Sequence, residues 1–347
     1  MSIAEQLTEE LQIELWQTEA VISLIDEGNT IPFIARYRKE KHGSLNDEQL
    51  RNFSERLTYL RNLAEKKEQV IASIEEQGLM TDELRVKIQE AKTQVAVDDL
   101  YRPYRPKKKT RATIAKAKGL EGLANIILLQ MTGMPVEDEA KAYISEEKEV
   151  LTAEDAINGA SDIIAEFISD NADYRTAIRR LTKNEGTLIS AAKDPDAQSV
   201  YENYYEFEEA VPKLSGYKVL AINRGEKEKF LNVKINAPED SIIRYLTKNV
   251  ITHDNKYTTP ILEAAIEDSY SRLIAPSIER DIRNDLTLMA ENGAINVFGS
   301  NLKQLLMQPP IAGQVVLGWD PAFRTGCKLA VVDQTGKVLD TAVVYPT

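Results

Sequence analysis

The sequence has 347 residues, 43% of them hydrophobic and 28% charged, a balance that excludes an intrinsically disordered chain. It carries 43 Lys and Arg against 55 Asp and Glu, and the resulting net charge of −12 excludes a uniformly basic nucleic-acid coat. One cysteine, Cys327, excludes an internal disulfide, and two histidines far apart in the sequence argue against a His-rich zinc site.

We expect a cytoplasmic protein of two or three domains with no membrane partner. A single cysteine is typical of a reducing compartment. The acidic, amphipathic N-terminus is unlike a secretory signal. The longest apolar run, around residues 126–129, is too short to span a bilayer.

Helix signals dominate the first 185 residues. Apolar residues recur every three or four positions over residues 50–74, interrupted by Lys67. Asn46 followed by Gln49 predicts a capping box at the start of this helix, and Gly78 predicts its end.

Two further threonines predict helix starts in this region. Thr81 opens a helix that runs towards Thr93, and Thr152 with Asp155 begins another. Breaks are predicted at residues 29–32 and 102–106, because proline disfavours helix at its own position and just before it.

The residue pattern changes from helical to strand-like between residues 186 and 235. Residues 218–223 and 229–235 are rich in β-branched and apolar side chains and predict an antiparallel hairpin, with residues 224–227 between the strands. The charged tip around residues 223–229 has a basic character that suits contact with a nucleic-acid backbone, although charged tips are commonly just solvated.

Helix resumes near Pro238, and Pro260 suits a first-turn position. Pro276 predicts a long helix kinked at that point or two abutting helices. Residues 315–319, 327–333 and 337–345 then predict three strands, the first of them buried. Three strands without a covering helix cannot bury both faces of a sheet, so we expect the chain to end inside a domain.

These elements predict a mainly α protein. It combines a multi-helical N-terminal region, a long central helix, a small antiparallel β element and the first strands of a truncated α/β domain. The expected parts are a helical region with a helix-turn-helix-like part, a β-hairpin-containing element, a helical region with the long helix, and the truncated domain, at residues 1–185, 186–237, 238–312 and 313–347.

The charges are separated along the chain. Residues 101–118 contain five Lys and three Arg with no acidic residue, whereas residues 135–173 contain twelve Asp and Glu against two Lys. Such a separation orients a chain in the field of a polyanion.

The basic run, residues 101–111, is the most distinctive chemistry in the sequence. Prolines favour an extended backbone, arginines bind phosphates bidentately, and tyrosines stack on bases. The first candidates for phosphate contact are Arg102, Arg105, Lys107, Lys108, Lys109 and Arg111. The alternative is that Arg102 and Arg105 pair with carboxylates and tie helices together, which would leave the lysines unexplained because a lysine run is usually solvated.

A second group of phosphate-contact candidates contains Arg36, Arg38 and Lys39. Residues 31–41 have the composition of the second helix of a helix-turn-helix, with a first helix beginning at Thr18. The alternative, which spacing favours, is a helix packed on its apolar face with a charged outer face. For Arg272, Arg280 and Arg283, surface ion pairs with neighbours such as Glu279 and Asp281 are favoured over nucleic-acid contact.

Asp320 at the end of a strand is the one weak candidate for catalysis. In nuclease sheets such an aspartate holds a metal that activates water, but this chemistry needs several converging carboxylates. The sequence contains no Walker A, Gly-x-Ser-x-Gly or Cys-x-x-Cys motif. We therefore expect no catalysis, no cofactor and no metal site.

Six sequence blocks in order give the chain a resemblance to the N-terminal half of bacterial Tex family proteins, which are transcription accessory factors. They are residues 30–40 (TIPFIARYRKE), 99–107 (DLYRPYRPK), 110–115 (TRATIA), 223–227 (NRGEK), 271–280 (SRLIAPSIER) and 317–328 (LGWDPAFRTGCK). The resemblance therefore covers nearly the whole chain.

The resemblance implies an architecture and partners. Family members have a helical N-terminal region with a helix-turn-helix-like part, a long central helix, a YqgF-type domain of RNase H fold, helix-hairpin-helix elements and an OB-fold RNA-binding domain. Residues from about 313 would be the opening strands of the YqgF-like domain, and Asp320 would match the first acidic position of the RNase H fold. Tex proteins are not established nucleases, and Ala322 replaces a glycine common in that motif.

The predicted function is non-catalytic transcription accessory work, in which the chain binds RNA or DNA without sequence preference and meets RNA polymerase or other transcription proteins. If about five cations neutralise phosphates, the log–log salt slope on duplex should be near −4 to −5. Two alternatives stay open. One is a metal-dependent nuclease or resolvase that uses Asp320, and the other is a protein-interaction scaffold whose acidic residues 135–173 meet a basic partner.

Overall fold

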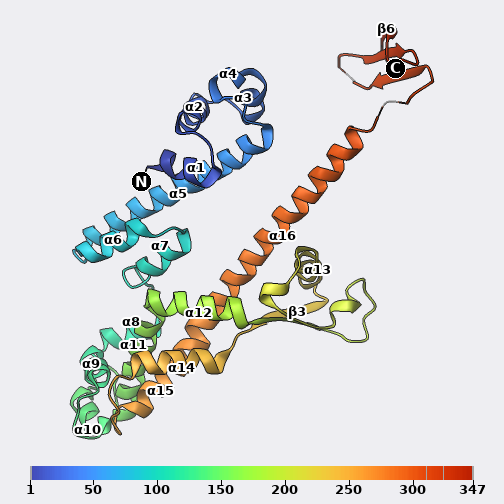
Figure 1. Cartoon of the computed structure of the whole chain (residues 1–347). Helices are drawn as coiled ribbons and strands as arrows, with labels where there is room; N and C mark the ends of the chain where they lie inside the picture. The colour runs from blue at the N-terminus through green and yellow to red at the C-terminus, as the bar shows by residue number, and fades with distance from the viewer. Residues whose placement is uncertain (1, 310, 323, 346–347) are drawn as a thin grey trace. The chain divides into compact units, whose positions relative to one another are not determined.

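The structure is a computed structural model that describes residues 2–309, 311–322 and 324–345. Most of these residues are helical and the strands form two small sheets (Figure 1), which confirms the prediction of a mainly α protein. The chain divides into two units. One comprises Met1–Ser190, Glu206–Lys213 and Lys234–Arg283, and the other comprises Ala191–Tyr205, Leu214–Val233 and Asn284–Thr347. Among the helices that the structure describes, none combines the length and the apolar composition of a membrane span.

The first helices enclose one apolar core. They are α1 (Ile3–Leu11), α2 (Leu15–Asp26), α3 (Ile31–Tyr37), α4 (Lys39–His42) and α5 (Asp47–Glu76). The predicted capping box at the start of α5 is confirmed, because the Asn46 side chain accepts from the Gln49 amide at 2.9 Å and the Gln49 side chain accepts from the Asn46 amide at 3.0 Å. Leu50 of α5 shares the core with Leu7 of α1 and Leu24 of α2.

The predicted single helix over residues 31–41 is wrong. The backbone leaves helical geometry at Arg38 (φ −132°, ψ 24°), so that α3 ends at Tyr37 and α4 begins at Lys39. The Arg38 side chain stabilises this break, because it donates to the Tyr37 carbonyl at 2.9 Å and lies 4.9 Å from the centre of the Phe33 ring. The helix-turn-helix interpretation stays a prediction.

Short helices follow α5 along the chain. They are α6 (Asp82–Glu90), α7 (Gln94–Tyr101), α8 (Arg111–Ala117), α9 (Glu121–Leu129), α10 (Val136–Ala140) and the 3₁₀ turn Lys141–Tyr143. Thr81 caps α6 as predicted, and Thr93 caps α7 by accepting from the Ala96 amide at 3.2 Å. The predicted break after Tyr101 is confirmed, and helix resumes behind Thr110, whose side chain accepts from the Thr113 amide at 3.0 Å.

The longer helices of the central region are α11 (Ala153–Asp170), α12 (Ala172–Glu185), α14 (Glu239–Val250), α15 (Thr259–Asp268) and α16 (Ala275–Leu306). The predicted capping box of Thr152 and Asp155 begins α11. A π-helical stretch, Ser269–Ile274, joins α15 to α16, whose second residue is Pro276. Proline cannot donate to the carbonyl four residues earlier and its ring needs room there, so the wider π turn accommodates it.

The first sheet has the strand order β2-β1-β3, with β1 (Thr187–Ala192), β2 (Glu206–Ala210) and β3 (Leu231–Asn236). The predicted hairpin is wrong, because residues 216–227 form α13 (Gly216–Lys227) and only β3 is a strand. Val219, Ile222 and Gly225 are the buried residues of α13, and their spacing of three puts them on one helix face. The predicted hairpin tip therefore begins inside a helix.

The second sheet is an antiparallel meander of β4 (Val316–Asp320), β5 (Cys327–Val332) and β6 (Val338–Val344), which confirms the three predicted strands. The prediction that β4 is buried is wrong, since Trp319 is 59% exposed and Leu317 is 55% exposed. Val338 and Val343 of β6 are also more than half exposed, at 55% and 53%, so apolar side chains of this sheet are accessible.

Candidate nucleic-acid interface

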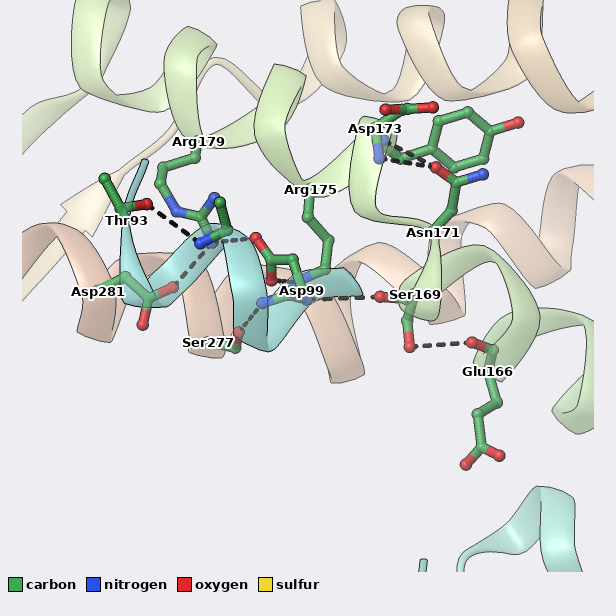
Figure 2. A network of polar contacts seen from close by, with 12 residues as sticks. Thr93, Asp99, Glu166, Ser169, Asn171, Asp173, Arg175, Arg179, Ser277 and Asp281 are labelled. Carbon is green, nitrogen blue, oxygen red and sulfur yellow. Dashed lines mark hydrogen bonds and ion pairs between the residues drawn. The ribbon is translucent and has the colours of Figure 1, made fainter. Parts of the chain in front are cut away.

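A buried ion-pair network anchors the helices around the basic run (Figure 2). Arg175 of α12 is 1% exposed, and its Nε donates to Asp99 Oδ1 of α7 at 2.6 Å. The same guanidinium donates to the hydroxyl of Ser277 on α16. Arg179 Nη2 lies 2.9 Å from Asp99 Oδ2 and 3.1 Å from Asp281 Oδ2. The network thereby joins α7, α12 and α16, and α7 is the helix that leads into the basic run.

Lys107 of the basic run is bound to α11. Its ammonium lies 3.2 Å from Glu166 Oε1 and forms an ion pair with Asp170. Burial raises the pKa of Asp170, and the hydrogen bond from Lys107 opposes that rise. The prediction that the lysines are the part of the run without internal partners is therefore wrong for Lys107, which braces the loop against α11.

Arg102 follows α7 directly and is half-buried. Burial lowers the pKa of its guanidinium, and the nearby Arg175 lowers it further. Asp99, Asp170 and Asp281 act in the opposite direction through space, but none of the described residues forms an ion pair with Arg102. The guanidinium is therefore partly buried without a neutralising ion pair among the described residues.

These residues surround a cavity of about 530 Å³, which we call the loop pocket. Its cationic lining residues are Arg102, Arg105, Lys107, Lys108, Arg175 and Arg280. Its carboxylates are Asp98, Asp99, Glu166, Asp170 and Asp281. Apolar side chains such as Val95 and Leu273 complete the wall. Helices α7, α11, α12 and α16 and the basic run all contribute to it.

Every carboxylate of the loop pocket already has a cationic partner. Asp98 pairs with Lys66 at 2.5 Å. Asp99 and Asp281 belong to the buried network, and Glu166 and Asp170 pair with Lys107. By contrast, within the described residues no ion pair is formed by the side chains of Arg102, Arg105, Lys108 and Arg280. Local pairing thus leaves the pocket with an excess of positive charge inside a protein whose net charge is −12.

The remaining candidates of the basic run lie outside the pocket lining. Lys109 is exposed and adopts a positive φ of 41°. Arg111 is 66% exposed at its side chain, with Nη1 4.0 Å from Asp162. The structure therefore brings Arg102, Arg105 and Lys108 together at one cavity and leaves the other two on the adjoining surface.

The second group of candidates lies on α3 and α4. Arg36 and Lys39 are exposed, and Arg38 is partly buried against Phe33. The buried His42 accepts at Nδ1 from the Leu45 amide at 3.1 Å, and its Nε2 lies 3.2 Å from the Ile34 carbonyl oxygen. His42 is thus a structural residue that holds α4 against α3, and it offers no free ring nitrogen to a ligand.

Asp320 is the last residue of β4, is exposed, and lies opposite Lys328 of β5 in the strand register. Within residues 2–309, 311–322 and 324–345, no group of three or more His, Cys, Asp or Glu side chains is placed to hold a metal ion. The cavity beside Asp320, about 640 Å³, is an open face of the sheet lined mainly by apolar residues such as Trp319 and Leu329.

Sequence reasoning missed the buried network and Arg280. Arg280 was expected to pair with Glu279 or Asp281, but Glu279 accepts from the Ile235 amide at 2.8 Å and Asp281 pairs with Arg179. The burial of Arg175 could have been predicted, because Ile178 lies three residues later on the same face of α12 and that apolar residue marks the face as buried. Its partner could not be predicted, because Asp99 lies 76 residues earlier in the chain.

Three models of one protein family match successive parts of the chain. The Tex-like protein N-terminal domain matches residues 1–75, the Tex central region-like model matches residues 132–298, and the Tex protein YqgF-like domain matches residues 314–347. Their order is the one that the sequence blocks indicated.

Relatives match along nearly the whole chain. The Bacillus subtilis protein YdcI is 50% identical over 99% of this chain and 48% of its own length. The transcriptional accessory protein Tex of Neisseria gonorrhoeae is 38% identical over 99% of this chain and 46% of its own. Human S1 RNA-binding domain-containing protein 1 is 33% identical over 99% of this chain and 36% of its own. The chain spans about half the length or less of these relatives. It belongs to the Tex family.

Proposed function

We propose that this chain forms part of a transcription accessory factor and associates with RNA or DNA by contacting backbone phosphates, without sequence preference and without catalysis of its own. Two relatives support the proposal by name, one a transcriptional accessory protein and one an S1 RNA-binding domain-containing protein. Since the chain spans about half of the first of these, the activity of the whole protein is part of the same proposal.

The observation that carries the proposal is that several exposed cations of the basic run have no ion-pair partner among the described residues. Arg105, Lys108 and Lys109 are exposed and form no ion pair within the described part of the chain, although carboxylates are abundant nearby. Exposed cations that a protein leaves unpaired next to satisfied carboxylates are available to an external anion. Backbone phosphates are the anions that transcription presents, and cations bind them without reading sequence.

The test measures fluorescence anisotropy of labelled single-stranded RNA and duplex DNA with the chain at low and moderate salt. The variant carries Arg105, Lys108 and Lys109 each changed to Glu. We expect salt-sensitive binding by the wild type and its loss in the variant. A matched control changes Arg244, Lys148 and Lys248 to Glu, because these exposed cations have the same composition and lie outside the loop pocket.

The result that contradicts the proposal is equal loss of binding in the two triple variants, which would make the attraction a matter of total charge. Absence of binding by the wild type at low salt contradicts it equally. In that case the contacts with nucleic acid would lie outside this chain.

The non-catalytic part of the proposal has its own test. Asp320→Asn should leave unchanged any nuclease activity that a preparation shows, because Asp320 has no converging carboxylates among the described residues. RNA polymerase and other transcription proteins are the proposed protein partners.

The proposed compartment is the reducing cytoplasm, which a single free cysteine, Cys327, suits.

A further inference from the structure

We propose that the loop pocket receives the terminal phosphate monoester of a nucleic-acid strand. This inference rests on the proposed function and deepens it, because it assigns to the pocket one particular phosphate, at the end of a strand, in addition to the backbone phosphates that the exposed cations contact.

The local charges are the first step. The pocket lining brings together four cationic side chains that have no ion-pair partner among the described residues, namely Arg102, Arg105, Lys108 and Arg280. The five carboxylates of the lining are all engaged by other cations. An anion that enters therefore meets unpaired positive charge and does not have to displace an existing ion pair.

The burial of Arg102 is the second step. A surface arginine interacts with a phosphate in high dielectric, where the attraction is weak. Arg102 is half-buried at the pocket wall, and its guanidinium presents a planar fork that matches two phosphate oxygens. The buried Asp99–Arg175 pair, which lines the same cavity, fixes the helix end from which Arg102 projects. The arginine is thus placed before a ligand arrives.

The charge of the ligand is the third step. An internal phosphodiester carries one negative charge, whereas a phosphate monoester carries about −1.5 to −2 at pH 7 and has an additional free oxygen. The lining, together with its ion-pair partners Lys66 and Arg179, has eight cations against five carboxylates, and this excess matches the higher charge. Internal phosphates are usually contacted along a continuous groove, whereas a cavity of about 530 Å³ falls in the size range of pockets that take one discrete ligand, which suits a terminal nucleotide with its phosphate. These features favour a strand end over a strand interior.

The experiment compares three single-stranded RNA ten-mers of one sequence, labelled internally, that carry a 5′-phosphate, a 3′-phosphate or no terminal phosphate. Anisotropy titrations with the wild-type chain should give about tenfold or more tighter binding for one of the phosphorylated strands. Arg102→Gln should abolish that preference, so that the three strands bind with equal affinity. Arg244→Gln, an exposed arginine outside the pocket, should keep the preference.

Arg105→Gln combined with Lys108→Gln provides a second variant whose changes are confined to exposed side chains, so it remains informative if Arg102→Gln fails to fold. It should reduce the preference as well. Equal binding of the three RNAs by the wild type overturns this inference and leaves the proposed function intact. Binding of none of them overturns both. A preference that survives in both pocket variants places the terminal phosphate elsewhere and overturns the inference alone.

Discussion

Asp99 balances the buried Arg175 and the partly buried Arg179, and this makes it the residue on which the folded state depends most clearly. Asp99→Ala would leave Arg175, 1% exposed, without its carboxylate. Removal of one partner from a buried pair costs about 3–5 kcal/mol, because the remaining charge stays desolvated. We expect the free energy of unfolding to fall by that amount in a urea titration followed by circular dichroism.

The matched comparison is the exposed pair between Glu83 and Lys87 on α6, whose atoms lie 2.7 Å apart. Lys87→Ala should leave the unfolding curve unchanged, because water already solvates both charges. If Asp99→Ala and Lys87→Ala behaved alike, the network would not be the structural anchor described above.

Lys107 makes a prediction about pH. Lys107→Met removes the cation that opposes the burial-induced rise in the pKa of Asp170, so this pKa should rise further. A carboxyl whose pKa is higher in the folded than in the unfolded state binds its proton more tightly when folded, so stability is lost as pH rises through the raised value. The variant should resemble the wild type below the ordinary Asp value of 3.8 and be less stable by about 1–3 kcal/mol at pH 8.

Urea titrations from pH 3 to pH 8 would show this divergence. Adding Asp170→Asn to Lys107→Met should reduce the pH dependence by the share that Asp170 contributes, and Glu166, the other carboxylate that Lys107 contacts, remains in this variant. A stability difference that stays constant over this pH range would show that Lys107 contributes packing and not charge.

Among the elements, local signals predicted helix starts well and the β element poorly. Asn46, Thr81 and Thr152 each cap a helix as predicted, because capping depends on residues only three positions apart. The α13 segment was read as a strand because its β-branched residues raise strand propensity. Val219 and Ile222 are buried at a spacing of three, and tertiary packing on that face overrides the propensity.

The junction between α12 and β1 depends on Gly186. A Cβ added at this position would lie 2.4 Å from the Thr182 carbonyl oxygen and 3.3 Å from that of Asn236, and both are backbone atoms that cannot rotate away. Gly186→Ala should therefore lower the free energy of unfolding by about 1–3 kcal/mol. The control Gly133→Ala meets no atom within 4 Å and should change it by less than about 0.5 kcal/mol. Equal effects in a urea titration would contradict this account of the junction.

For the whole chain, the acidic stretch and the basic run are connected. Residues 135–173 suggested an acidic face for a basic protein partner, but Asp162 pairs with Arg272, and Glu166 and Asp170 pair with Lys107. Part of the acidic charge is therefore used inside the structure. The site could be predicted from the sequence as a set of cations, but which of them are free depends on contacts between residues far apart in the chain, such as the 63 positions between Lys107 and Asp170.

This internal pairing changes the expected salt dependence of nucleic-acid binding. Five phosphate contacts would give a log–log slope on duplex near −4 to −5, but the structure leaves three or four free cations near the basic run, which corresponds to about −3 to −4. Lys109→Gln removes one exposed, unpaired cation, so it should make the slope shallower by about 1. Lys107→Met removes a cation already neutralised by carboxylates, so it should leave the slope unchanged even where it lowers stability. Anisotropy titrations over salt concentration measure both slopes. A loss of about 1 in Lys107→Met would mean that the carboxylates release Lys107 when nucleic acid binds, and that the pairing seen in the free chain is exchanged for phosphate contact.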